Sequence, residues 1–172
     1  MRSDWRQMAT GLMAALALTL TTATAQEAAD CRQRQASDPP RTIYECANGI
    51  VVEAEAAVVL GLVEMDGEEG PAALDLGEGG VLIERRDGEG ELQIRTPHAI
   101  ASVRGTVFVV DVAPQATAVF VIAGAVAVAR PDGSDEVVLA DGEGVDVQPG
   151  QPLTVRRWPD DRVEPLLSRF GR

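Results

Sequence analysis

The sequence predicts an all-β protein: a single twisted β-sandwich or solenoid-like domain of many short strands, followed by a short C-terminal helix or tail. Apolar and polar residues alternate in many short runs, which is the periodicity of half-buried strands. Turn-forming residues recur at intervals of roughly 8 to 12 residues, and the 17 glycines and 10 prolines favour turns over long helices. Aromatic residues make up only 3% of the chain, so aliphatic residues must build the core.

The first 25 residues have the three parts of a secretory signal peptide. Arg2 and Arg6 are positive, Ala9–Leu20 is mostly apolar, and Ala23-Thr24-Ala25 matches the A-x-A cleavage pattern. The apolar run is shorter than the roughly 20 residues that span a bilayer. We therefore expect cleavage after Ala25, export to the periplasm of a Gram-negative envelope or beyond the cell, and no membrane span in the mature chain.

Residues 26–47 form a polar segment that contains both cysteines, Cys31 and Cys46. An exported protein meets an oxidising compartment, and this spacing differs from the C-x-x-C of a redox pair. We expect a Cys31–Cys46 disulfide, which closes a loop of about 16 residues and contributes about 3 kcal/mol in the chain-entropy model. The bond would pin the polar segment against the first strand. Asp30, directly before Cys31, argues against a lipid anchor there.

Residues 48–157 carry the strand pattern of the predicted β domain. One short strand is expected just before this domain, at 43–45. Within the domain, short strands are expected at 49–53, 57–63, 73–76, 81–83 and 92–96, and again at 137–139, 145–147 and 153–157. Asp-Gly pairs at 66–67 and 87–88 mark turns, the second a hairpin signal.

The most informative stretch runs from Thr96 to Val128. Thr96-Pro97 ends an extended segment, because proline disfavours the helical conformation in the residue before it. Alternation then predicts strands at 106–112, 116–123 and 125–130, interrupted by Pro114-Gln115 and by Gly124. Three consecutive strands with short connections predict an antiparallel β-meander.

This stretch also resembles a known family. The string Thr96-Pro97-x-Ala99-Ile100-x-x-Val103-Arg104-Gly105-Thr106-x-Phe108 is similar to the signature of the FecR domain. Gly124-x-Val126-x-Val128 and Val137-Val138-Leu139-Ala140-x-Gly142 are similar to the segments that come after that signature in the family. The resemblance covers residues 48–148 and is clearest from 96 to 142. It implies a twisted all-β domain with some solenoid character, whose structural motif residues here are Thr96, Pro97, Gly105, Thr106, Phe108 and Gly124.

Two neighbouring motif residues receive different interpretations. Gly105 suits a position that needs a positive φ or a close approach of the backbone. Arg104 either pairs with a carboxylate or lies on a surface that a partner contacts, and it is the candidate binding residue.

Residues 158–172 have a helical pattern. Asp160 or Asp161 can cap a helix, and Gly171 suits its C-terminal end. We expect a short helix or docked tail whose Trp158 and Phe170 cover one end of the β core. The apolar residues at helical spacing are Val163, Leu166, Leu167 and Phe170.

The composition excludes several kinds of function. A formal net charge of −12 argues against nucleic acid and anionic membranes. His98, the one histidine, reads as a solvated turn residue, so no metal site, cofactor or Ser–His catalytic group is expected. The acidic pairs Glu53/Glu55 and Glu68/Glu69 leave a glycosidase-like site open, although sugar binding usually recruits aromatic residues.

Two functional hypotheses result. The FecR family includes membrane-spanning regulators that relay an iron-uptake signal from an outer-membrane receptor to a cytoplasmic sigma factor. The sequence shows no anti-sigma region before its apolar segment and little room after residue 150 for a receptor-contacting subdomain. We therefore expect an exported, non-enzymatic FecR-domain protein that binds a protein partner or envelope component, with a role in envelope signalling. The alternative is an envelope carbohydrate-binding module or carboxylate-based hydrolase.

Overall fold

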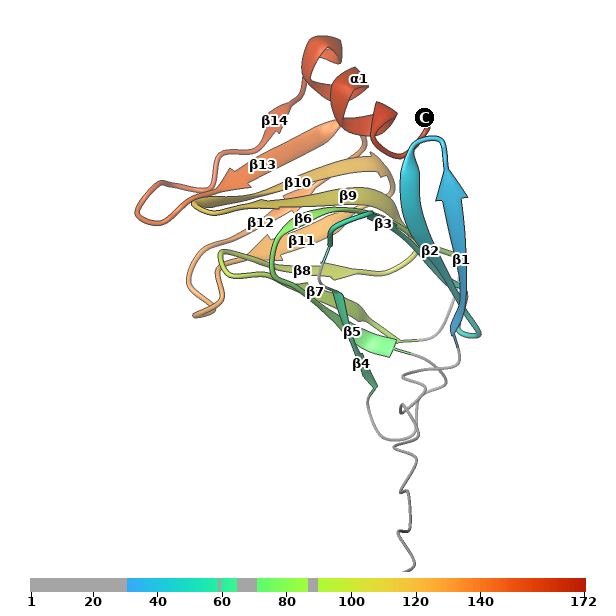
Figure 1. The fold of residues 1–172 in the computed structure, drawn as a ribbon. Helices are drawn as coiled ribbons and strands as arrows, with labels where there is room; N and C mark the ends of the chain where they lie inside the picture. The colour runs from blue at the N-terminus through green and yellow to red at the C-terminus, as the bar shows by residue number, and fades with distance from the viewer. Residues whose placement is uncertain (1–30, 59, 65–70, 87–89) are drawn as a thin grey trace, which may run out of the picture.

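The computed structural model describes residues 31–58, 60–64, 71–86 and 90–172, whose strands form two facing β-sheets (Figure 1). The prediction of an all-β fold is confirmed, and the two sheets pack as a sandwich. The predicted signal peptide, residues 1–25, and the acidic turns at 65–70 and 87–89 lie outside the described residues.

One sheet has eight strands in the order β1-β2-β3-β6-β9-β10-β13-β14, and all of its neighbours are antiparallel. The bounds are β1 Cys31–Ser37, β2 Pro40–Cys46, β3 Ile50–Glu55, β6 Gly79–Arg85, β9 Val107–Ala113, β10 Ala116–Ala123, β13 Glu143–Val147 and β14 Arg156–Arg157.

The other sheet has six strands in the order β12-β11-β8-β7-β5-β4, in which β5 and β7 are parallel and the remaining pairs antiparallel. The bounds are β4 Leu60–Glu64, β5 Pro71–Leu76, β7 Leu92–Arg95, β8 Ile100–Val103, β11 Val126–Ala129 and β12 Glu136–Leu139.

Residues of both sheets share one apolar core. In β9, Phe108 and Val110 belong to this core, whereas Val109 between them belongs to a second cluster on the opposite face of the eight-stranded sheet. Successive side chains of a strand point to opposite faces, so β9 is buried on both sides. The core is mostly aliphatic, as the composition predicts; its fully buried members include Ile50, Val52, Leu74, Ile83, Leu92 and Ile94.

The predicted three-stranded meander is wrong. β9 and β10 form an antiparallel hairpin, but the next strand, β11, lies in the other sheet between β8 and β12. The chain changes sheets at Gly124, which has a φ of +98°. The residues of β11 alternate as those of β10 do, so the local pattern carried no sign of this change.

The first two strands form a hairpin joined by the predicted disulfide. Cys31 pairs directly with Cys46, and their sulfur atoms are bonded, which confirms the predicted bridge. The segment expected to be merely polar is instead strand β1, with residues 32–35 exposed. Because β1 is an edge strand without a buried face, its sequence shows no apolar alternation.

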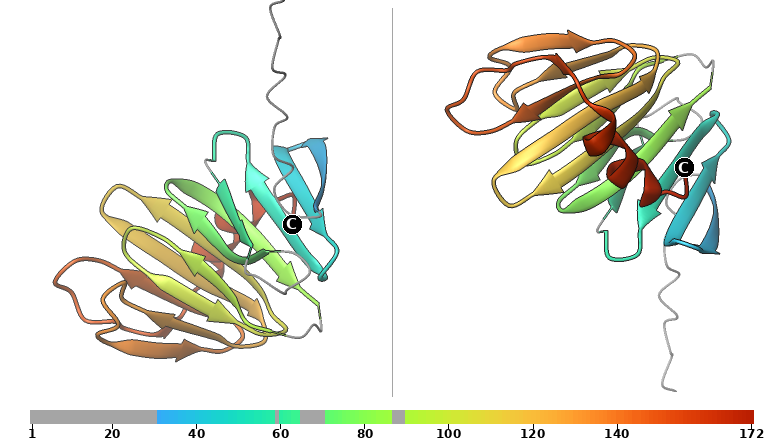
Figure 2. Two further views of the ribbon diagram at one scale, coloured as in Figure 1. Left: turned by 90° about the horizontal axis from the view of Figure 1, so that it is seen from below. Right: turned by 90° about the horizontal axis from the view of Figure 1, so that it is seen from above.

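The predicted C-terminal helix is confirmed as α1, Asp160–Ser168. It lies across the outer face of the eight-stranded sheet (Figure 2). There Trp158 and Phe170 pack with Leu166 against Leu82 and the neighbouring apolar residues of β9 and β10. The expectation that Trp158 and Phe170 cover one end of the core is therefore wrong, since they cover a face.

The start of α1 also differs from the prediction. Pro159 is the N-cap residue, and no side chain makes a capping hydrogen bond. Asp160 and Asp161 occupy the first turn instead, where their negative charges interact favourably with the positive end of the helix dipole. None of the described helices is long and apolar enough to cross a membrane.

Candidate binding groove

Three turns that are distant in sequence line a groove at one end of the sandwich. They are the β7–β8 turn, the β11–β12 turn and the turn after β13, and the groove between them has a volume of about 580 Å³. We call it the Arg130 groove. Its lining residues are Pro97, His98, Arg130, Pro131, Asp132, Asp135, Pro149, Gly150, Gln151 and Pro152.

Arg130 connects two walls of this groove. Its Nε donates to Asp135 Oδ2 at 3.1 Å, and its Nη1 donates to the carbonyl oxygen of Gln148 at 3.1 Å. Its Nη2 donates to the carbonyl oxygen of Gln151. The Arg130 side chain is only 15% exposed. One guanidinium thus fixes the β11–β12 turn relative to the turn after β13.

A partly buried hydroxyl network fixes the third wall. Thr96 Oγ1 accepts from the backbone N–H of Ala99 at 2.9 Å and lies 2.9 Å from Oγ1 of Thr117, which is fully buried in β10. His98 Nδ1 lies 3.2 Å from the same Thr117 hydroxyl. The prediction that His98 is a turn residue agrees with its position, but the ring is half-buried and hydrogen-bonded, not fully solvated.

The acidic wall of the groove is preorganised. Asp132 Oδ1 accepts from the Ser134 hydroxyl at 2.7 Å and from the Ser134 backbone N–H at 3.0 Å. These hydrogen bonds, the hydroxyl's first, lower the pKa of Asp132 below its ordinary value. Asp135 has a φ of +49°, a left-handed conformation that Asp tolerates better than most residues. Both carboxylates are therefore held in place before any ligand arrives.

The groove offers hydrogen-bonding groups and proline rings in a rigid frame. Among the described residues, no group of three or more His, Cys, Asp or Glu side chains could hold a metal ion. Pockets that combine apolar surface with a few fixed polar groups are typical of binding sites. The arrangement is suited to holding a ligand.

The motif residues do not form a single site. Thr96 and Pro97 lie at the groove, whereas Arg104 and Gly105 lie beyond the other end of β8. Gly105 has a φ of +66°, the backbone conformation considered for it from the sequence. Arg104 is exposed and makes no ion pair with another described residue. It stays a proposed contact residue, separate from the groove.

Three further motif residues serve the fold. Phe108 is fully buried in the core, and Thr106 is 2% exposed. A Cβ added to Gly124 would lie 2.7 Å from Thr106 Cγ2 and 2.9 Å from the carbonyl oxygen of Gly105. The β10–β11 turn and the β8–β9 turn therefore pack against each other too closely for a side chain at position 124.

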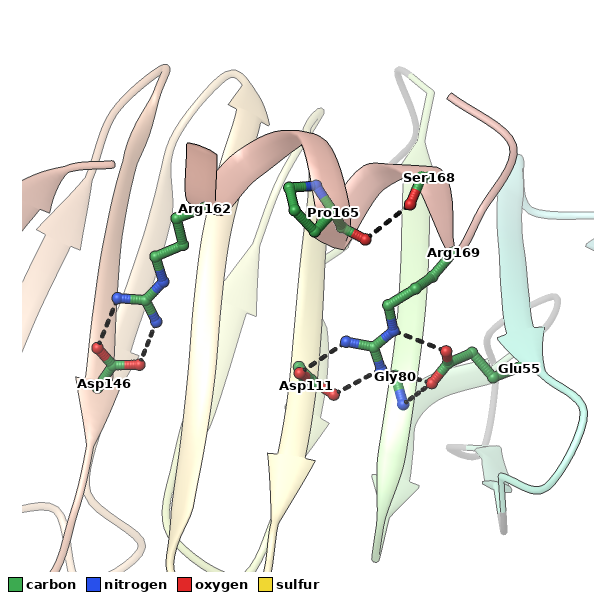
Figure 3. A network of polar contacts seen from close by, with 8 residues as sticks. All are labelled: Glu55, Gly80, Asp111, Asp146, Arg162, Pro165, Ser168 and Arg169. Carbon is green, nitrogen blue, oxygen red and sulfur yellow. Dashed lines mark hydrogen bonds and ion pairs between the residues drawn. The ribbon is translucent and has the colours of Figure 1, made fainter. Parts of the chain in front are cut away.

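The acidic pair Glu53 and Glu55 belongs to an arginine network under the C-terminal helix. Arg169 donates to both oxygens of Glu55, at 2.7 and 2.6 Å, and to both oxygens of Asp111, at 2.8 and 2.9 Å (Figure 3). Glu53 accepts from Arg41 at 2.6 Å and from Arg172 at 2.9 Å. These carboxylates are bound by guanidinium groups, and those of Arg169 and Arg172 fasten the C-terminal segment to the sheet.

The same contacts hold Arg169 in its charged form. The hydrogen bonds from Arg169 to Glu55, and then those to Asp111, raise the pKa of its guanidinium further above its already high value. The other pair considered from the sequence, Glu68 and Glu69, lies outside the described residues.

Neither the Arg130 groove nor the Arg169 network is indicated by a local sequence pattern. Arg130 follows a strand and Asp132–Ser134 reads as an ordinary turn, so neither stood out locally. Arg169 and Glu55 are 114 positions apart in sequence. The local pattern that bears on the Arg169 network is the helical apolar spacing that predicts α1. A helix with an apolar side must pack against the rest of the fold, and this packing brings Leu166 and Arg169 to the sheet.

The fold and the groove define a class of protein: an all-β sandwich with one helix-covered face and a rigid, turn-lined groove. Comparison with known families identifies part of the chain: residues 45–127 match the family model described as FecR protein, so this segment is a FecR domain. No curated protein matches the chain in sequence.

Two solved structures share the fold. Both are crystal structures of a protein from Parabacteroides distasonis ATCC 8503 described as a "putative anti-sigma factor", with TM-scores of 0.58 and 0.61 and 20% sequence identity in each case. The matches cover 81% and 80% of this chain but only 62% and 64% of those chains. This chain thus spans less than two thirds of their length, and the likeness concerns the fold alone.

Proposed function

We propose that this chain is an exported, non-enzymatic FecR-domain protein that binds a protein partner in the cell envelope and acts in envelope signalling. The observation that carries the proposal is the Arg130 groove. Its walls come from three hairpin turns, and two polar networks hold them rigid without closing the space between them. A preformed groove binds with little loss of conformational entropy.

The match of residues 45–127 to the FecR family supports a regulatory role over an enzymatic one. The pair Glu53 and Glu55, which left a hydrolase possible from the sequence, is already bound by arginines. Glu53 accepts from Arg41 and Arg172, and Glu55 accepts from Arg169. The groove itself presents one half-buried imidazole and two fixed carboxylates, of which Asp135 is already paired with Arg130. These contacts favour binding as the function of the site.

Export is supported by the disulfide and by the signal-peptide pattern. A Cys31–Cys46 bridge is stable in an oxidising compartment such as the periplasm. Intact-mass measurement of the protein purified from the envelope fraction is expected to give a chain that starts at Gln26 with both cysteines oxidised. A retained apolar segment or two free thiols would contradict export.

Capture from detergent-solubilised envelope extract tests partner binding. The immobilised mature chain is expected to retain one protein partner, identified by mass spectrometry. Pro149→Trp places an indole in the groove and is expected to reduce capture at least about tenfold. Pro114→Trp is the matched control, because Pro114 is an exposed proline in the β9–β10 turn and does not line the groove. Equal capture by both variants would exclude the groove as the contact site.

A further inference from the structure

A second groove lies beside the Arg130 groove and shares the wall formed by Gln151 and Pro152. Its volume is about 550 Å³, and it runs between β13, β14 and the start of α1. Three arginines line it: Arg156, Arg157 and Arg162. We call it the arginine groove. Three guanidinium groups in one groove are unexpected in a chain with a net charge of −12.

Seven arginines of the described residues pair with carboxylates, and Arg162 of this groove is one of them. They are Arg34, Arg41, Arg86, Arg130, Arg162, Arg169 and Arg172. Arg156 and Arg157 are exposed and make no ion pair with a described residue. The Arg157 guanidinium donates only to the backbone carbonyl of Asp141, at 3.1 Å.

The carboxylates around the arginine groove already have other partners. Asp146 is held by two hydrogen bonds from Arg162, at 2.6 and 3.0 Å. Glu143 lies opposite Arg157 in the sheet, but its carboxylate accepts from the Ala140 backbone N–H at 2.9 Å. Asp141 Oδ1 accepts from the backbone N–H of Gly124 at 2.7 Å. Arg156 and Arg157 thus have no carboxylate partner among the described residues and are available to a ligand in the groove that they line.

The other side of the groove is rigid. The Trp158 ring stacks on Phe120 with centroids 5.2 Å apart, and the Arg162 guanidinium lies over it at 3.4 Å. Gly144 has no side chain, and any Cβ there would collide with Trp158. Trp158, which lines the groove next to Arg157, is therefore fixed in place and is itself largely buried.

We propose that the arginine groove binds a carboxylate-bearing segment of the protein partner, with Arg156 and Arg157 as the recognising residues. This inference rests on the proposed function. A guanidinium group matches the geometry of a carboxylate with two parallel hydrogen bonds. Because the two grooves share a wall, one extended segment can contact both.

Charge favours a short acidic segment over a long polyanion. The net charge of −12 repels a polyanionic glycan as it approaches. Salt screens that repulsion beyond about 8 Å at physiological ionic strength, so one or two carboxylates can still reach a local pair of arginines. An acidic glycan is therefore an outcome of the test and not the proposal.

Calorimetric titration of the mature chain tests the proposal. The probe is a synthetic octapeptide of alternating Asp and Gly, with its Asn-Gly counterpart as the uncharged control and heparin as the polyanionic glycan. We expect the Asp-Gly peptide alone to bind. The double variant Arg156→Gln/Arg157→Gln is expected to weaken its binding about tenfold, as the loss of two charge-assisted contacts implies.

A matched variant controls for the loss of net charge. Arg32→Gln/Arg34→Gln removes two positive charges from the exposed edge strand β1 and is expected to leave the affinity for the Asp-Gly peptide unchanged. Arg156→Gln alone guards against misfolding, because Arg157 also supports the turn at Asp141; it is expected to weaken binding severalfold. Binding that survives in the double variant, binding of heparin in place of the peptide, or no binding would each overturn the proposal.

A different result would contradict the proposed function. If wild-type protein captures no partner from envelope extract, the proposed function is contradicted whatever the peptide does. If a partner is captured equally by wild type and by Arg156→Gln/Arg157→Gln, the proposed function stands and the role of the arginine groove is wrong.

Discussion

Gly124 determines where the chain leaves one sheet for the other. Its φ of +98° is poorly accessible to residues with a Cβ, and the space at that position is filled by Thr106 and the Gly105 carbonyl group. Its own backbone N–H donates to Asp141 Oδ1 at 2.7 Å. The β8–β9 turn, the β10–β11 turn and the turn at Asp141 therefore meet at a residue without a side chain.

Gly124→Ala is expected to destabilise the protein by about 2 to 4 kcal/mol, through left-handed strain and overpacking together. Gly133→Ala is the matched control. Gly133 also has a positive φ, +76°, but a Cβ there would meet nothing within 4 Å. It should cost only about 1 kcal/mol from strain. Equal denaturation midpoints for the two variants would show that the contact with Thr106 is unimportant.

The Ser134 side chain affects the charge of Asp132 in the groove. Its hydroxyl makes the largest contribution to lowering the pKa of Asp132. Ser134→Ala is expected to raise that pKa toward the ordinary value of 3.8, measured by the pH dependence of the carboxyl carbon shift.

The sign of the pH effect is set by this lowered pKa. A carboxyl group with a lowered folded pKa stabilises the fold above its unfolded pKa, and this contribution is lost as the pH falls through the folded value. The groove of the wild-type protein should therefore keep its negative charge to a lower pH than that of Ser134→Ala. An unchanged Asp132 titration in the variant would contradict the hydrogen bond.

At the scale of elements, α1 is fastened to the sheet by charge as well as by apolar contact. Leu166 and Phe170 are buried against the outer face, and Arg169 bridges two strands of that face, β3 through Glu55 and β9 through Asp111 (Figure 3). Without Arg169, two partly buried carboxylates would lie near each other without their cation. Partly buried charges without a counter-ion lower the free energy of unfolding.

Arg169→Gln is expected to lower the free energy of unfolding of the docked helix by about 2 kcal/mol, a value reduced because the group is one third exposed. Hydrogen exchange of residues 160–170 should rise accordingly. Arg86→Gln is the control, because its ion pair with Glu84 lies at the surface and should contribute less than about 1 kcal/mol. Unchanged exchange in Arg169→Gln would mean that apolar packing alone holds the helix.

The elements predicted from the sequence are those with buried apolar residues. β6, β9 and β10 are rich in apolar residues because both of their faces are buried, and α1 has a helical apolar spacing because one side of it packs on the sheet. β1 was missed as a strand because neither of its faces is buried. β8 was missed because Thr96-Pro97 hides the start of a strand of only four residues.

At the scale of the whole molecule, the grooves depend on which distant turns meet. Register brings them together: Ala129 pairs with Ile100 in one sheet, and Thr117 pairs with Val147 in the other. Position 130 thereby comes next to the turn at 96–99, and the turn after β13 comes next to Thr117. Local periodicity specifies strands but not their partners, so the sequence motif indicated the family and the fold without indicating either groove.

Photo-crosslinking in living cells tests partner binding most directly, with a photoreactive phenylalanine analogue in place of Pro152, where the two grooves meet. We expect one crosslinked protein partner in the envelope fraction. The same analogue in place of Gln33, an exposed residue of the edge strand β1, should give none. No crosslink from position 152, or the same crosslink from both positions, would contradict a partner-binding function of these grooves.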